Sequence, residues 1–286
     1  MSNRLAVIPQ YLLPKRVITV LAGKLANLRG GAFTHAVIRR FVAHYRVDMS
    51  EAAQSRIEQY PTFNDFFTRP LRTGVRPIAD APFVCPVDAS VSQFGPIEHD
   101  QIFQAKGHSY STRALVGGDQ ELAHRFDGGH FATLYLAPRD YHRIHMPCDG
   151  RLVRMIHVPG DLFSVNPLTA RHVPNLFARN ERVVCVFDTA VGPFVNVLVG
   201  ATIVGSVATV WHGVVNPPPR AGIREWRYDD RSIALVKGQE MARFLLGSTV
   251  VMLFPKGVLT FVSDWAPSRP VRLGEPMATA AAGPRD

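Results

Sequence analysis

Short runs rich in Val, Ile, Thr and Phe, separated by Gly and Pro, fill most of the chain from about Val84 onward. Such runs are typical of β-strands. The clearest cover residues 131–136, 152–158, 182–187, 194–199, 201–210 and 250–254. Long βαβ crossovers are absent from this pattern, which argues against a doubly wound parallel sheet. The sequence therefore predicts an α+β fold, mainly an antiparallel β-sandwich or open barrel.

The composition is that of an ordinary globular protein. The chain has 286 residues, 47% of them hydrophobic, which is enough for one large or two small domains with a proper core. Its three cysteines, Cys85, Cys148 and Cys185, are odd in number and far apart. That spacing argues against a disulfide framework and favours a reducing compartment, with the thiols as small buried side chains.

The positive charge of the chain is concentrated at its N-terminus. The formal net charge is +9. Residues 1–47 contain eight Lys or Arg and no Asp or Glu, so the remainder is nearly balanced, with 24 basic and 23 acidic residues. A nucleic-acid-binding protein is expected to carry basic residues across its fold. A basic, apolar N-terminal segment instead favours contact with an anionic membrane surface.

Two amphipathic helices are predicted within residues 1–60. Apolar side chains recur at spacings of three and four at Val17, Ile18, Leu21, Leu25 and Leu28, and again at Val37, Phe41, Val42 and Tyr45. A short acidic helix is expected from about 50 to 59. The early apolar run is far short of the ~20 residues that span a bilayer. We therefore expect residues 1–60 to form a basic helical segment that docks on the membrane, or alternatively packs as a hairpin on the core, with residues 61–286 as a β-rich catalytic domain.

Ser248 lies between Gly247 and Thr249 in an apolar, β-branched run that reads as a buried strand. Other motif blocks precede it in order. They cover residues 60–67 (Tyr-Pro-Thr-Phe-Asn-Asp-Phe-Phe), 86–89 (Pro-Val-Asp-Ala), 105–111, 138–147 (Pro-Arg-Asp-Tyr-His-Arg-Ile-His-Met-Pro), 160–166, 175–182 and 237–241. Together these blocks resemble the bacterial, pyruvoyl-dependent phosphatidylserine decarboxylase proenzymes over about residues 60–254. Val87 and Ala89 depart from the family's Pro-Ala-Asp-Gly stretch.

This resemblance implies a self-cleaving precursor. The family uses an aspartate, a histidine and a serine, which match Asp88, His145 and Ser248 here. Ser248 Oγ is a poor nucleophile unless a base takes its proton, a task that suits a histidine. Attack on the carbonyl carbon of Gly247 would give an ester, and β-elimination would then release residues 1–247 as the larger chain. The smaller chain, 248–286, would begin with a pyruvoyl group derived from Ser248.

The resemblance also implies the reaction that follows. Decarboxylation of an amino acid leaves a carbanion, and the pyruvoyl ketone at position 248, bound to the substrate amine as a Schiff base, can accept those electrons. His142 matches the family histidine associated with this step. Arg139 and Arg143 could hold a carboxylate or phosphate, although solvated strand-end charges are the simpler interpretation. The implied substrate is phosphatidylserine, the products are phosphatidylethanolamine and CO2, and the implied location is peripheral on the cytoplasmic side of the cell membrane.

Three alternatives remain open from the residues alone. The His142–His145 spacing could bind a metal on a helix, but Pro138 and Pro147 bracket the segment and disfavour a helix. The order Asp88, His145, Ser248 also occurs in serine hydrolases, whose nucleophile commonly begins a helix, unlike the strand pattern after Ser248. A non-enzymatic membrane-binding module would bind lipid and release no CO2.

The two cleaved chains are expected to form a heterodimer, and its further dimerisation is left open. No nucleic-acid partner and no metal are expected.

Overall fold

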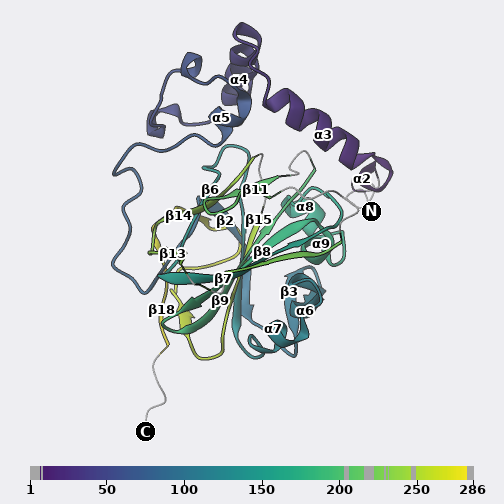
Figure 1. The fold of residues 1–286 in the computed structure, drawn as a ribbon, viewed down its shortest axis with the longest axis vertical. Helices are drawn as coiled ribbons and strands as arrows, with labels where there is room; N and C mark the ends of the chain where they lie inside the picture. The colour runs from purple at the N-terminus through teal and green to yellow at the C-terminus, as the bar shows by residue number, and fades with distance from the viewer. Residues whose placement is uncertain are drawn as a thin grey trace.

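The computed structural model describes residue 7, residues 9–202, 206–215 and 222–228, residue 230, and residues 232–245 and 249–281. Gly247 and Ser248 lie outside the described residues. The N-terminal helices group at one end of the molecule, next to the β-sheets that make up most of the chain (Figure 1).

A nine-stranded sheet forms the centre of the fold. Its strands follow the order β12-β7-β8-β9-β15-β5-β2-β17, with β13 paired to β7, and each of these pairings is antiparallel. The bounds are β2 Ala89–Pro96, β5 His130–Tyr135, β7 Gly150–Val158, β8 Arg182–Thr189, β9 Gly192–Val199, β12 Arg224–Arg227, β13 Ala234–Leu235, β15 Thr249–Phe254 and β17 Pro270–Val271. The sheet is open, because the described strands do not close it into a barrel.

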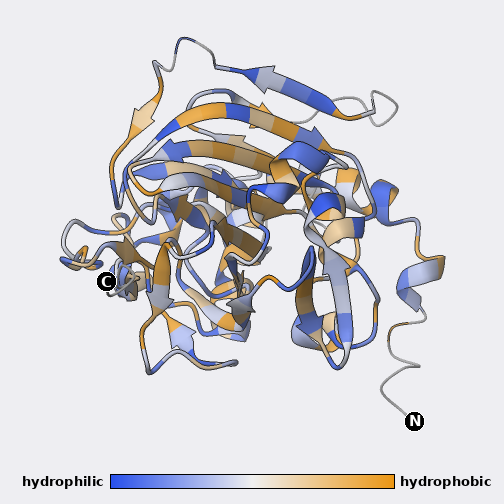
Figure 2. Cartoon of the chain, turned by 90° about the horizontal axis from the view of Figure 1, so that it is seen from below, coloured by the Kyte–Doolittle hydropathy of each residue, from blue (hydrophilic) through white to orange (hydrophobic). Residues whose placement is uncertain are grey.

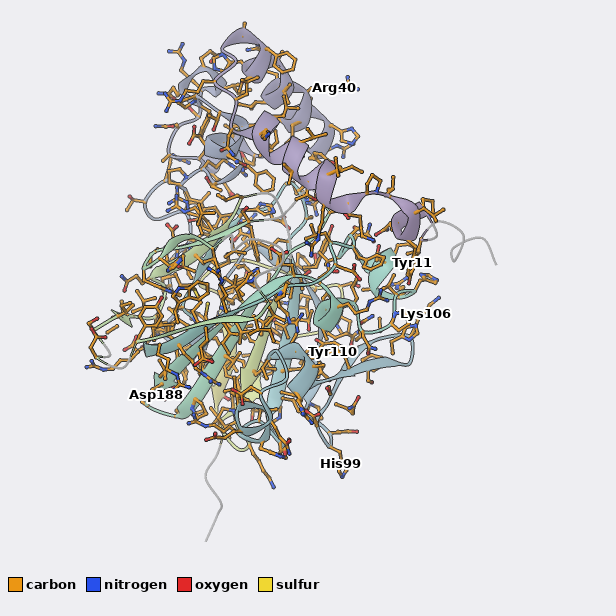
Figure 3. The ribbon with its side chains drawn as sticks, turned by 45° about the vertical axis from the view of Figure 1, so that its right-hand side comes forward. Tyr11, Arg40, His99, Lys106, Tyr110 and Asp188 are labelled. Carbon is orange, nitrogen blue, oxygen red and sulfur yellow. The ribbon has the colours of Figure 1, made fainter. Side chains whose placement is uncertain are left out.

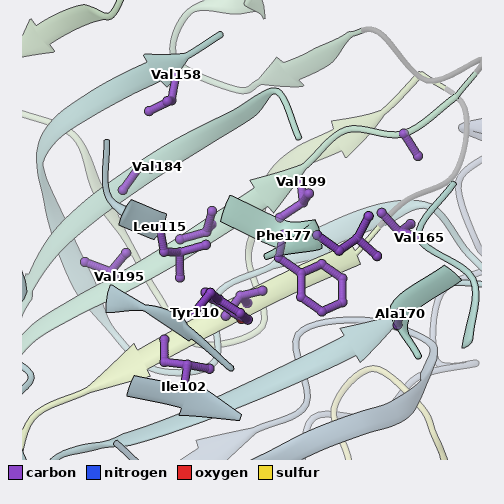
Figure 4. Close-up of a cluster of buried hydrophobic side chains, with 14 of the residues drawn as sticks. Ile102, Tyr110, Leu115, Val158, Val165, Ala170, Phe177, Val184, Val195 and Val199 are labelled. Carbon is purple, nitrogen blue, oxygen red and sulfur yellow. The ribbon is translucent and has the colours of Figure 1, made fainter. Parts of the chain in front are cut away.

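Both faces of this sheet are buried, which explains why its central strands read as continuous apolar runs. Along β15, Val251 and Leu253 face one core, whereas Val250 and Met252 face the other. Successive side chains of a strand point to opposite faces, so one strand supplies two cores. Figure 2 shows apolar residues concentrated along these strands, and Figure 4 shows part of the first core.

Smaller sheets cover one face and short helices cover the other. The second core is completed by a four-stranded sheet, β11-β10-β14-β6, and a three-stranded sheet, β1-β18-β16. Their bounds are β1 Phe83–Val84, β6 Arg143–His145, β10 Val207–Thr209, β11 Gly213–Val215, β14 Glu240–Phe244, β16 Leu259–Phe261 and β18 Pro276–Ala280. The first core is covered by α5 Phe63–Phe67, α6 Thr112–Leu115, α7 Gln120–His124, α8 Pro167–Ala170, α9 Leu176–Arg179 and the hairpin of β3 Gln101–Ala105 with β4 His108–Ser111.

The N-terminal segment forms α2 Pro9–Leu12, α3 Lys15–Ala26 and α4 Ala32–Tyr45. Its predicted apolar stripe is largely exposed: Val17 is 58% exposed, Leu21 60% and Leu25 53%. The helix α4 packs Ile38 into the first core, next to α5, whereas Arg40 is exposed and labelled on the outer side of the segment in Figure 3. The segment therefore joins the core through α4 and leaves much of its apolar surface uncovered.

The sequence-based expectations are confirmed for the fold class and corrected in three details. The helix α3 ends at Ala26, so Leu28 lies beyond it. The expected helix over 50–59 is replaced by two short 3₁₀ turns, η1 Met49–Glu51 and η2 Ile57–Gln59, because the chain is extended between them. The expected strand over 201–210 forms only at Val207–Thr209, and residues 203–205 are not described. In the described part of the chain, no helix has both the length and the apolar character to cross a bilayer.

Candidate active site

Three adjacent strands of the central sheet bring the candidate residues to one end of it. Ser90 of β2 lies opposite Tyr135 of β5, and Tyr135 lies opposite Thr249 of β15. Because both pairings are antiparallel, β2 and β15 begin at the end of the sheet where β5 finishes. A residue just before β2, a residue just before β15 and the segment just after β5 therefore leave the sheet at the same end.

The predicted catalytic residues occupy these positions in the chain. Asp88 immediately precedes β2, and His142 and His145 follow β5. Ser248 is the residue before Thr249 in the sequence but lies outside the described residues. Leu245 and Thr249 are the described residues on either side of the predicted cleavage site. The Leu245 backbone N–H donates to the Ser206 carbonyl at 3.1 Å.

Asp88 is held by an arginine that the sequence reading did not identify. Arg76 donates from Nε to both oxygens of Asp88, at 3.0 and 3.1 Å, and from Nη2 to Oδ2 at 2.6 Å. The Leu273 backbone N–H also donates to Asp88 Oδ1 at 2.9 Å. The same guanidinium binds Glu51, at 2.6 and 3.1 Å. Arg76 is thus shared by two carboxylates and fixes the position of Asp88.

His145 is oriented by a backbone carbonyl. Its Nδ1 lies 2.8 Å from the Gly238 carbonyl oxygen, which can only accept, so Nδ1 carries the proton in the neutral ring. Nε2 is then the basic nitrogen, and it lies 3.1 Å from the Tyr141 hydroxyl, which can donate to it. Burial is the main cause that lowers the pKa of His145 below its ordinary value of 6.5. The ring is therefore neutral at neutral pH and can act as a base.

His142 is fully buried and has one nitrogen without a protein partner. Nδ1 donates to the Asp140 carbonyl at 2.7 Å, which leaves the Nε2 lone pair free, and Nε2 has no hydrogen-bond partner among the described residues. The ring packs on Phe67, with 4.1 Å between the ring centroids. Burial lowers the pKa of His142 to about 3. A neutral, buried acceptor of this kind is typical of a functional site.

The two histidines and the aspartate share one neighbourhood but not one hydrogen-bond chain. The backbone N–H of His145 donates to the Pro86 carbonyl at 2.9 Å, so β6 lies beside the segment that leads to Asp88. Within the described part of the chain, however, Asp88 and His145 do not hydrogen-bond to each other, since Asp88 binds Arg76 and His145 binds Gly238. The triad with Ser248 therefore stays a prediction, and in this structure the Gly238 carbonyl, rather than a carboxylate, fixes the tautomer of His145.

The two arginines singled out in the sequence differ in their surroundings. Arg143 is largely buried, with 16% of its side chain exposed, and it binds Glu240 at 2.8 Å and the Thr68 carbonyl at 2.8 Å. The interpretation of Arg143 as a solvated charge is wrong, because Glu240 of β14 and the Thr68 carbonyl, just after α5, bind its guanidinium. The Arg139 side chain is 64% exposed and only 3.8 Å from Asp140, in agreement with that interpretation.

The described residues next to the predicted cleavage segment carry two buried polar atoms without a partner. The Phe244 N–H donates to the His142 carbonyl at 3.0 Å, so the strand that enters the cleavage segment runs beside His142. The His142 Nε2 atom and the Thr249 Oγ1 atom are both buried without a partner among the described residues. The Thr249 hydroxyl can donate to a carbonyl oxygen, whereas the His142 Nε2 lone pair can accept from an N–H or O–H donor such as a substrate amine, and buried polar atoms left without such partners cost free energy.

The fold and the site define a β-rich protein with a buried acid–base site at the end of one central sheet. Comparison with known proteins gives its family. The family described as phosphatidylserine decarboxylase matches residues 63–279, and a second family, described as PSD, matches residues 5–46. The chain belongs to the phosphatidylserine decarboxylase family.

Individual relatives match nearly the whole chain. The phosphatidylserine decarboxylase proenzyme of Dechloromonas aromatica is 68% identical over 281 residues, which cover 98% of this chain and 100% of the relative. The proenzymes of Methylibium petroleiphilum and Variovorax paradoxus are each 70% identical, over 98% of this chain and 99% of the relative. The resemblance found in the sequence motifs is thereby confirmed.

Proposed function

We propose that this chain cleaves itself between Gly247 and Ser248 and then converts phosphatidylserine to phosphatidylethanolamine and CO2. Proenzymes of this family carry a pyruvoyl group that derives from a serine, and we assign that serine to Ser248. The observation that carries the proposal is the convergence of Asp88, His142, His145 and the start of β15 at one end of the central sheet.

Self-cleavage begins with Ser248 Oγ. His145 Nε2, neutral and basic, takes the hydroxyl proton as Oγ attacks the carbonyl carbon of Gly247. The peptide nitrogen leaves that carbon and takes up a proton, so an ester replaces the amide. Loss of the Ser248 α-proton then breaks the Cβ–O bond and releases the Gly247 carboxylate. The remaining dehydroalanine adds water and loses ammonia, which leaves a pyruvoyl group on residue 248.

In the second reaction, the pyruvoyl ketone supplies an electron sink for the carbanion that decarboxylation creates. His142 acts in the proton transfer to the substrate Cα. Its free Nε2 accepts a hydrogen bond from the substrate amine, and after CO2 has left, a proton from solvent is relayed through Nε2 to Cα. Because burial holds the pKa of His142 to about 3, the protonated ring is a strong acid within the site and gives up its proton readily. The ring is held for this task by Phe67 and the Asp140 carbonyl.

The two chains stay together after cleavage, in this proposal, because the smaller one supplies the centre of the main sheet. The strand β15 lies between β5 and β9, and each residue of β15 is buried. The α chain is 248–286 and the β chain 1–247, and together they form the functional heterodimer. Further dimerisation of this heterodimer is not required by the site.

We place the enzyme peripherally on the cytoplasmic face of the cell membrane. Two features support this location. The exposed apolar residues of α3 lie on the same segment that carries eight basic and no acidic residues within 1–47. Such a surface combines apolar insertion with attraction to anionic lipids. Residues 1–60 are then the docking segment and 61–286 the catalytic part.

The experiment is to incubate the purified protein with vesicles that contain phosphatidylserine labelled at the carboxyl carbon. We expect labelled CO2 and unlabelled phosphatidylethanolamine, together with two unequal bands on a denaturing gel. A single band with ester hydrolysis would support the serine-hydrolase alternative. Vesicle binding without CO2 from cleaved, folded protein would support a non-enzymatic membrane module.

A further inference from the structure

A basic cleft opens beside Asp88, between the end of α4 and the start of β2. Its volume is about 260 Å³. It is lined by five arginines and four carboxylates: Arg46, Arg69, Arg76, Arg139 and Arg272, with Asp48, Glu51, Asp88 and Asp140. Tyr141, the hydroxyl partner of His145, also lines it, so the cleft reaches the candidate active site.

One of these arginines, Arg69, is buried without a counterion in the part of the chain that the structure describes. Arg69 is 4% exposed, yet among the described residues no carboxylate lies within ion-pair distance of it. Its Nη2 donates to the Arg139 carbonyl at a long 3.3 Å, and its Nε has no partner in that same set of residues. The carboxylates of the cleft are committed elsewhere: Asp88 and Glu51 bind Arg76, and Asp140 accepts from the Ala137 N–H.

A buried charge without a directly bound counterion is costly even where carboxylates lie farther off, as Asp88, Glu51 and Asp140 do here, so Arg69 is expected to bind an anion when the protein acts. Arg69 stays charged because a guanidinium is not deprotonated in proteins, although burial lowers its pKa. Packing holds it in place. It follows the α5 helix, whose Phe66 ring lies 5.3 Å from the guanidinium carbon, and the adjacent Phe67 packs on His142. One short helix therefore positions both Arg69 and His142.

We propose that Arg69 binds the phosphodiester of the lipid head group, with Arg139 at the mouth of the cleft as a secondary contact. This inference rests on the proposed function. The substrate offers two anions, a phosphate and a carboxylate. The carboxylate leaves as neutral CO2, so an arginine bound to it would stabilise the ground state more than the transition state and slow the reaction. The phosphate keeps its charge throughout the reaction, so a guanidinium bound to it positions the substrate without favouring the ground state over the transition state.

The test compares two substrates in wild type and Arg69→Met. Dihexanoyl phosphatidylserine carries the phosphodiester. O-octyl-L-serine keeps the amine and the carboxylate but has an ether instead of the phosphodiester. We expect wild type to prefer the phosphodiester substrate in kcat/KM, and Arg69→Met to lose about tenfold to a hundredfold of that preference, mainly through KM. If Arg69→Met still decarboxylates and its kcat/KM preference for the phosphodiester substrate is unchanged, the proposal is overturned. Arg69 would then hold the carboxylate or only support the fold.

A matched control and a second measurement separate folding from binding. Arg72 is exposed on the same segment and does not line the cleft, so Arg72→Met should keep the wild-type ratio. If Arg69→Met does not self-cleave, its decarboxylation cannot be measured, and competition assays with the wild-type enzyme test the proposal instead. Glycerophosphocholine, a phosphodiester without a primary amine, should compete with substrate, and choline should not. Competition by inorganic phosphate but not by the diester would assign the site to free phosphate and contradict a head-group role. Complete inactivity of wild type would instead refute the proposed function.

Discussion

Arg76 and Asp88 form a two-point ion pair, with Arg76 Nε within 3.1 Å of both Asp88 oxygens and Nη2 at 2.6 Å from one of them. Only 7% of the Arg76 side chain and 11% of the Asp88 side chain are exposed. The pair is completed by Glu51 on one side and by the Leu273 N–H on the other. Because Leu273 follows the proposed cleavage site, this cluster also joins the two chains of the mature protein.

Removal of Arg76 should weaken the fold and slow maturation. Arg76→Ala removes the cation that Asp88 and Glu51 share and leaves only the more exposed Arg272 beside Glu51. Breaking such a pair costs about 3–5 kcal/mol in a fully buried setting, with less expected here. We expect a clear fall in the free energy of unfolding by urea denaturation and slower self-cleavage in cell-free synthesis. Arg72→Ala, an exposed neighbour, is the control. Wild-type maturation in a destabilised Arg76→Ala protein would show that the pair only supports the fold.

The pH dependence of self-cleavage should report the lowered pKa of His145. The base acts in its neutral form, and burial shifts its pKa below 6.5, so the neutral form persists as the pH falls past that value. The rate constant should therefore be flat at neutral pH and fall only below 6.5, when followed by gel after cell-free synthesis. His145→Ala should not mature. A midpoint above pH 6.5 would exclude His145 in this environment as the base.

His142 should affect the second reaction more than the first. In His142→Ala, the nitrogen that relays the proton to Cα is absent, whereas the His145 hydrogen bonds to Gly238 and Tyr141 remain. We expect at least partial maturation on a gel, but a fall in kcat of about a hundredfold or more, the usual contribution of a positioned acid–base group. Full decarboxylase activity in this variant would remove His142 from the site.

Local patterns predicted the strands better than the partners of the site residues. The runs around β5, β7, β8, β9 and β15 were visible because strands buried on both faces are almost wholly apolar. The role of Gly238 could not be seen, because a backbone carbonyl leaves no side-chain signal. Arg76 gave no signal either, since a lone arginine twelve residues before Asp88 has no spacing rule. Arg69 lies just outside the motif at 60–67, and its distinguishing feature, burial without an ion-pair partner among the described residues, is visible only in the structure.

The exposed apolar side chains of α3 should govern activity on membranes. Val20, Leu21 and Leu25 are each more than half exposed, so replacing all three with Ser leaves the core intact. The lost insertion should weaken vesicle binding by at least about tenfold, while dihexanoyl phosphatidylserine in solution is still decarboxylated. Added salt should weaken the binding further, because each Lys or Arg contributes about 1 kcal/mol at an anionic surface.

The triple Ser variant tests membrane docking better than a deletion of the basic segment, residues 1–47, would. Ile38 and Val47 belong to the first core, so the deletion would uncover part of it as well as the membrane face. Equal losses on vesicles and on the soluble substrate in the triple Ser variant would indicate that α3 serves the fold rather than membrane docking.

The intact mass of the purified protein tests the central claim most directly. For wild type we expect two species, one with the mass of residues 1–247 and one with the mass of residues 248–286 carrying a pyruvoyl group in place of the serine. Ser248→Ala should give one species with the mass of the full chain. A single full-length mass for wild type, or cleavage at position 247 in Ser248→Ala, would contradict the account.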